Sequence, residues 1–144
     1  LGDVYKRQLK NRFGDRIKIL SGVDTLALES LLMGADGWVA GLVCAFPKET
    51  VAIYELAKAG RTQEAIDIYR WFLPLLELDI NTKLVQNIKL AEVATGIGSE
   101  HVRAPRLPLI GEERANVLQI IEAGLKSRPE LPAYKELQGA KITA

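Results

Sequence analysis

The stretch ILSGVDTLALESLLMGADGWVAGL, residues 19–42, decides the fold of this chain. It continues the short alternating segment RIKIL (16–20), which is typical of a β-strand and which stops at a glycine, Gly22. Leucines at positions 28, 31 and 32 then recur at helical spacing. A second apolar segment, rich in glycine and valine, is typical of a parallel strand that is buried on both faces. The order strand, helix, strand predicts a right-handed β-α-β unit.

Two residues at the ends of the central helix agree with this prediction. Asp24 has a side chain that suits an N-cap, and Gly34 suits the position just after the last helical turn. We therefore expect a strand at about 16–20 to run parallel to a strand at about 38–43, with a helix between them.

From Pro47 onward the pattern predicts helices alone. Proline suits a first helical position, and the first of these helices should end near Gly60. Three more are expected, at about 62–76, at about 82–95 and around 115–125. Pro74 should bend the second of them, because it removes one hydrogen bond of the helix.

The amino-acid composition argues against two classes of binding partner, nucleic acids and membranes. The chain has 144 residues, 48% of them apolar, with 19 basic and 18 acidic side chains. No basic cluster is interleaved with aromatic residues, so we expect no nucleic-acid partner. No apolar run reaches the roughly twenty residues of a membrane helix, so we expect no membrane partner either.

Cysteine and histidine each occur once, as Cys44 and His101. A single cysteine cannot form a disulfide within the chain, and the pair gives too few ligands for a metal site. We expect a cytoplasmic protein with neither a metal nor a cofactor, in which Cys44 is a small core residue.

Two neighbouring parallel strands do not make a stable sheet, because both outer edges would remain unpaired. Further strands should therefore precede them. Residues 1–12 show no clear period, and we treat them as a segment that could be foreign to the fold.

The quoted stretch, above all Gly22, Asp24 and the GADG of residues 34–37, is followed by a helical part and by VRAPRLPL (102–109). In this order and spacing, over about 13–125, the chain resembles the dihydrodipicolinate synthase and N-acetylneuraminate lyase family. Members are (β/α)8 barrels followed by a small helical bundle, and they form a Schiff base between a 2-oxo acid and a barrel lysine.

The resemblance implies an α/β fold that comprises the last two β/α units of a (β/α)8 TIM barrel and a carboxy-terminal helical bundle. The barrel part would cover residues 13–60, the bundle 61–128 and a tail 129–144. Strands one to six would lie upstream, together with the Schiff-base lysine, the tyrosine proton carrier and the Thr-Thr pair that binds the carboxylate.

The chain would thus hold no catalytic residue and would be inactive alone. Its parent would be a lyase similar to 4-hydroxy-tetrahydrodipicolinate synthase, a homo-oligomer (dimer or tetramer) that acts on a pyruvate-like 2-oxo acid.

Four residues match substrate-binding positions of the family. Gly22 and Asp24 follow the predicted first strand, and Val39 and Gly41 lie in the second. Active sites of such barrels lie at the carboxyl ends of the strands. We expect Gly22 at the pocket floor of the parent, with no room for a side chain. Sialic-acid-cleaving members have glutamate at the position of Thr25 and serine at that of Gly41, so sialic acid is not expected as the substrate.

Each of these residues also has a purely structural interpretation. Gly22 suits a tight turn, Asp24 suits an N-cap, and Val39 and Gly41 would fill a barrel. Lys18 is the one lysine in a predicted strand, and we expect it to point outward rather than to replace the catalytic lysine.

Two alternatives remain open. Arg103 and Arg106 flank prolines and could bind an anion, but we expect them rather to position the bundle against the barrel. The segment AKAGRTQEAIDIYRWFL (57–73) resembles one unit of a tetratricopeptide repeat, which would make the chain a helical interaction module. A solenoid needs about three such units, and we find one.

Overall fold

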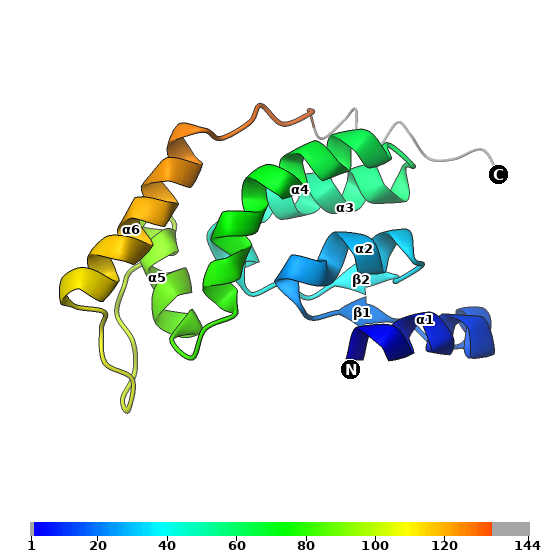
Figure 1. Cartoon of the computed structure of the whole chain (residues 1–144), viewed down its shortest axis with the longest axis horizontal. Coiled ribbons are helices and arrows are strands. Elements are labelled where there is room, and N and C mark those ends of the chain that lie inside the picture. The colour runs from blue at the N-terminus through cyan, green and yellow to red at the C-terminus, as the bar shows by residue number, and fades with distance from the viewer. Residues whose placement is uncertain (1, 134–144) are drawn as a thin grey trace.

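The computed structural model describes residues 2–133. Eight regular elements follow one another along the chain (Figure 1). They are α1 (Gly2–Phe13), β1 (Leu20–Ser21), α2 (Ala27–Leu32), β2 (Gly37–Trp38), α3 (Pro47–Lys58), α4 (Thr62–Leu76), α5 (Leu84–Ala94) and α6 (Gly111–Lys126). Four 3-10 turns lie between them: η1 (Gly14–Arg16), η2 (Asp24–Leu26), η3 (Leu42–Cys44) and η4 (Glu77–Asp79).

The two strands are parallel, as the sequence predicts. Leu20 pairs with Gly37, and Ser21 pairs with Trp38. The backbone N–H of Val39 donates to the carbonyl of Ser21 at 2.8 Å, which extends the pairing by one step. Helix α2 connects the strands and lies beside them in Figure 1.

Both strands are shorter than predicted. Of the predicted strand 16–20 only Leu20 lies in β1, and Arg16 belongs to η1 instead. The predicted strand 38–43 is wrong beyond Trp38. Residues 42–44 form the 3-10 turn η3 instead, and Val39 is 63% exposed rather than buried on both faces. The reason lies in Asp24, whose carboxylate accepts the N–H of Gly41 at 3.2 Å and that of Leu42 at 3.0 Å. These two donors are therefore withdrawn from any sheet.

The predicted end of α2 is confirmed, and its predicted start is wrong. Gly34 has a φ of +98°, a conformation that glycine adopts without strain, and it follows the last helical turn. Asp24 is not the N-cap. It begins η2, and α2 starts three residues later, after Leu26, without a side-chain cap.

The four helices predicted after Pro47 are confirmed, with bounds within a few residues of those expected. They share one core with the segment after β2 (Figure 1), at whose centre Phe46, Phe72, Ile53 and Leu56 are fully buried. The rings of Phe46 and Phe72 meet edge to face at 5.4 Å. Pro74 lies inside α4, whose ribbon changes direction along its length in Figure 1.

Helix α1 was not predicted. It lies next to a second, small group of buried side chains, Ile19, Leu31 and Ala35, at the amino-terminal end of the described chain. The division of the chain at residues 13, 61 and 129 stays a prediction. Most of the predicted tail, from residue 134 on, lies outside the described residues.

Candidate functional site

The four predicted substrate-binding residues lie just past the ends of the two strands. Gly22 and Asp24 follow β1, while Val39 and Gly41 follow β2. Because the strands are parallel, both pairs are at the same edge of the sheet, where barrel enzymes have their active sites. The structure links Asp24 directly to Gly41, as its hydrogen bonds show.

The Asp24 carboxylate is buried, with the residue 1% exposed. Its Oδ1 accepts a hydrogen bond from the indole Nε1 of Trp38 at 3.0 Å, and both its oxygens are 3.2 Å from the N–H of Gly41. Oδ2 also accepts from the N–H of Leu42. Three donors from the segment after β2 thus converge on one side chain of the segment after β1. Asp24 therefore holds the two strand ends together.

The helical part of the chain also holds the segment around Asp24 in place. The Tyr69 hydroxyl, on α4, donates to the backbone carbonyl of Asp24 at 2.7 Å and accepts from the N–H of Ala27 at 3.1 Å. Burial strongly raises the pKa of Tyr69, and the charge of Glu29 adds to this. The hydroxyl therefore stays protonated, and α4 fixes the turn that carries Asp24.

Gly41 is a glycine because another side chain occupies the space of its Cβ. A Cβ added there would lie 2.8 Å from Cγ of Asp79 and closer still to its Oδ1. Asp79 belongs to η4, after α4, so the helical part of the chain reaches directly to the end of β2.

Asp79 brings a second carboxyl group to this strand end. Its Oδ1 is buried and has no hydrogen-bond partner among the described residues. Burial raises the pKa of Asp79, and the negative charge of Asp24 raises it further. An unpartnered, buried oxygen is costly when the group is ionised, so the fold favours the protonated form.

The remaining two predicted residues are exposed. A Cβ added at Gly22 would meet no atom within 4 Å, and the φ of Gly22 is not in the left-handed region. The expected crowding around Gly22 is therefore absent from this chain, and the turn interpretation finds no support either. Val39 is 63% exposed and borders an open cavity of about 510 Å³ between β2 and α3.

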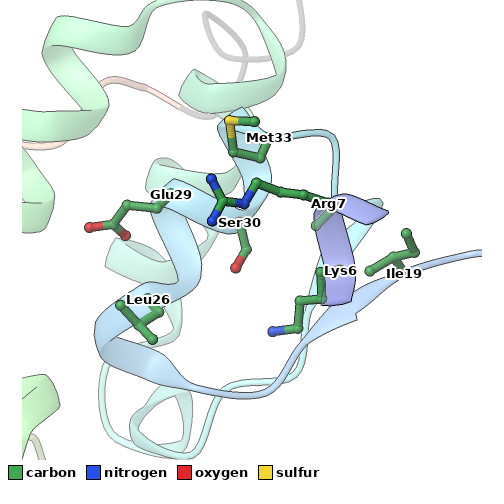
Figure 2. A pocket seen from close by; sticks show the side chains of 8 residues that line it. Lys6, Arg7, Ile19, Leu26, Glu29, Ser30 and Met33 are labelled. Atoms are coloured by element: carbon green, nitrogen blue, oxygen red, sulfur yellow. The ribbon is translucent and has the colours of Figure 1, made fainter. Parts of the chain in front are cut away.

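A different cavity, of about 250 Å³, contains none of the four residues. Figure 2 shows its two sides, with Lys6 and Arg7 of α1 facing Leu26 and the α2 residues Glu29 and Ser30. Because none of the four predicted substrate-binding residues lines it, this cavity adds nothing to the site at the strand ends.

Three other residues singled out in the sequence can also be placed. Cys44 is exposed, so its predicted role as a core residue is wrong. Lys18 points outward, as predicted, with a side chain 69% exposed and paired with Asp36 at 3.2 Å. His101 is exposed.

Among residues 2–133, no group of three or more histidine, cysteine, aspartate or glutamate side chains is placed to hold a metal ion. In the same part of the chain, no helix has the length and apolar character needed to cross a membrane.

Comparison with known proteins identifies the family. The sequence profile of the dihydrodipicolinate synthetase family matches residues 1–124, which is most of the chain. The chain belongs to this family. The match includes residues 1–12, which we had set apart.

This chain aligns with only part of the length of each curated member of the dihydrodipicolinate synthetase family. The 4-hydroxy-tetrahydrodipicolinate synthase of Sorangium cellulosum is 34% identical over 123 residues, which cover 85% of this chain and 40% of the relative. An uncharacterized DapA-like lyase of Pyrobaculum arsenaticum is 30% identical over 131 residues, which cover 84% and 44%. The chain thus spans about two fifths of the length of these relatives.

Solved structures agree with this assignment. The 4-hydroxy-tetrahydrodipicolinate synthase of Methylacidiphilum fumariolicum SolV superposes with a TM-score of 0.71 at 26% identity, over 96% of this chain and 44% of the other. The dihydrodipicolinate synthase of Aquifex aeolicus gives a TM-score of 0.74 at 22% identity, over 83% and 41%, and shows the fold alone. The chain is therefore a short piece of an α/β family fold, consistent with a partial TIM barrel.

The sequence did not reveal three residues of this site: Trp38, Tyr69 and Asp79. Tyr69 lies within the predicted helix 62–76, where nothing points to Asp24 as its partner, and Asp79 lies 38 positions after Gly41. One local signal existed, since Asp79 is an acidic residue directly behind a long apolar helix. Nothing in the sequence, however, indicates which strand end it contacts.

Proposed function

We propose that this chain is the carboxy-terminal part of a Schiff-base lyase that acts on a 2-oxo acid such as pyruvate. In this proposal β1 and β2 are strands seven and eight of a (β/α)8 barrel, α3 is the last barrel helix, and α4, α5 and α6 form the terminal helical bundle. The observation that carries the proposal is the parallel pairing of β1 and β2 in a chain of this family.

The proposed inactivity of the chain alone follows from its lysines. A Schiff-base lysine needs a lowered pKa, which requires burial or a neighbouring positive charge. Among the described residues no lysine is buried, and Lys10 even has a raised pKa, because Asp15 accepts its hydrogen bond. This supports an upstream position for the catalytic lysine, together with the tyrosine and the Thr-Thr pair.

The proposed role of the residues that follow β1 and β2 depends on placing these strands as strands seven and eight of the barrel. Val39 and Gly41 would border the 2-oxo acid, with Gly22 at the pocket floor once the upstream strands surround it. Asp24 would act mainly by fixing the strand ends, because all its described hydrogen bonds go to this chain's own backbone and to Trp38. We therefore change its expected role from substrate ligand to positioning residue.

The remaining parts of the proposal concern the whole protein. We propose a cytoplasmic homo-oligomer, a dimer or a tetramer. Lysine biosynthesis, sugar-acid breakdown and hydroxyproline breakdown all stay open as pathways, because the loops that choose the second substrate lie mostly upstream. No finding supports the tetratricopeptide alternative, and the strand pair has no place in a helical solenoid.

The test uses the coding sequence upstream of residue 1. The longer product is incubated with pyruvate, reduced with borohydride and digested for mass spectrometry. We expect one pyruvate adduct, on a lysine upstream of this chain. A longer product that folds and forms no adduct would contradict the proposed activity.

A further inference from the structure

A basic cavity lies between α5 and the loop that leads to α6. It measures about 440 Å³ and is lined by Val85 and Lys89 of α5 and by Ser99, His101, Val102, Arg103 and Arg106 of the loop. It shares no residue with the strand ends described above. The chain as a whole has a net charge of only +1, so this concentration of positive charge is local.

The loop is built to hold its two arginines together. The N–H of Arg106 donates to the carbonyl of Arg103 at 3.1 Å, which closes a tight turn with the arginines at its first and last positions. Val102 and Leu109, on either side of the turn, are buried. Gln86 of α5 also donates to the carbonyl of Leu107 at 3.2 Å. The turn is thus docked on α5.

The charges that face the cavity are poorly compensated. Within the described part of the chain, the guanidinium groups of Arg103 and Arg106 and the ring of His101 make no hydrogen bond or ion pair. Lys89 has one partner, Glu92, at 3.2 Å. The positive charges of Lys89, Arg103 and Arg106 are therefore compensated by only one negative charge, that of Glu92. Arg61 and Arg114, which are half-buried, have the acidic partners Glu64 and Glu100.

We propose that this cavity binds the phosphate group of a small organic phosphate. A phosphate dianion offers three acceptor oxygens and about two negative charges, which match two guanidinium forks, one ammonium and one hydroxyl. A single carboxylate has half that charge. The cavity is also larger than a phosphate ion needs, and Val85 and Val102 provide apolar contacts for a short carbon body.

The proposal can be tested on the 144-residue chain by titration calorimetry and by the shift of its melting temperature. The probes are inorganic phosphate, glycerol 3-phosphate and succinate, at constant ionic strength. We expect saturable binding of both phosphates, with glycerol 3-phosphate tighter, and weaker binding of succinate. Inorganic phosphate binding as tightly as the ester would contradict a role for the carbon body, and succinate binding more tightly than either would overturn the phosphate assignment.

Variants tie the binding to the cavity. Arg103→Gln with Arg106→Gln should weaken phosphate binding by about tenfold or more, because two charge-assisted hydrogen-bond donors are lost. The matched control, Arg70→Gln with Lys126→Gln, removes two exposed positive charges elsewhere and should bind as the parent chain does.

Both variants are checked for folding by circular dichroism, and Arg106→Glu serves as a second test if the double variant does not fold. The proposal is overturned if the parent chain shows no saturable binding. It is equally overturned if the control loses as much affinity as the cavity variant.

Discussion

The carboxyl groups of Asp24 and Asp79 both lie beside the backbone of Gly41, and their environments differ. Asp24 is satisfied by three donors, whereas Asp79 brings a buried oxygen without a partner to the same place. The family resemblance could single out Gly22, Asp24, Val39 and Gly41 from the sequence. It could not indicate Asp79, because a contact between residues 41 and 79 depends on how helix α4 packs and leaves no local pattern.

Gly22 and Gly41 make a matched pair for testing this arrangement. Gly41→Ala should lower the free energy of unfolding by about 1–3 kcal/mol, because its Cβ would overlap Asp79. Gly22→Ala should change it by about 0.5 kcal/mol or less, since nothing lies within 4 Å. Urea unfolding measures both. Equal costs for the two substitutions would show that Asp79 does not restrict Gly41.

Asp79 should also give the stability of the chain a particular dependence on pH. Its pKa is higher in the fold than in the unfolded chain, so the fold holds the proton more tightly. The free energy of unfolding should therefore fall as the pH rises from the ordinary aspartate value, about 3.9, through the raised value. Asp79→Asn removes this loss. The free energy of unfolding of the variant should therefore increase relative to that of the parent chain as the pH rises.

The comparison is made by urea unfolding at several pH values between about 4 and 7. Asp67→Asn is the control, because Asp67 is exposed and, within the described part of the chain, accepts a side-chain hydrogen bond from Gln63 alone. A stability difference between Asp79→Asn and the parent that does not vary with pH would contradict the proposed protonation.

At the scale of elements, the sequence predicted helices better than strands. Helical periodicity is local, so the four helices after Pro47 could be placed within a few residues. A strand exists only where another chain segment pairs with it, and the residues from 39 on are held by Asp24 instead. Helix α1 was not predicted because most of its sequence is polar, although Tyr5, Leu9 and Phe13 do recur every four residues.

The ion pair that ties the segment after α6 to α3 gives a prediction for these elements. Glu49, in the first turn of α3, is fully buried and its Oε1 accepts a hydrogen bond from Nε of Arg128, just after α6. Arg128→Ala leaves this buried carboxylate without its partner. We expect a loss of about 2 kcal/mol in the free energy of unfolding, below the usual range for a buried pair because Arg128 is 39% exposed.

Arg114→Ala is the matched control, because it breaks an ion pair with Glu100 in which both side chains are exposed. Its cost should be about 1 kcal/mol or less. If Glu49 is the cause, Glu49→Gln should recover part of the loss in the Arg128→Ala chain. No recovery would assign the effect to the packing of Arg128 on the ring of Phe46.

For the whole molecule, the two-stranded sheet predicts self-association. Both strand edges lack a neighbour among the described residues, and Leu20 and Val39 beside them are 55% and 63% exposed. Unpaired edges and exposed apolar side chains favour aggregation. Sedimentation velocity should show open-ended association that grows with concentration, whereas a longer product with the upstream strands should sediment as one closed oligomer of defined size. A stable monomer at all concentrations would contradict this prediction.

Pyruvate trapping tests the proposal that the catalytic lysine of the parent lyase lies upstream of this chain. The 144-residue chain is incubated with pyruvate, reduced with borohydride and weighed by mass spectrometry, with the longer product as the positive control. We expect an unchanged mass, because no described lysine is buried, as a Schiff-base lysine has to be. A stoichiometric adduct on any one lysine, Lys18 above all, would contradict it.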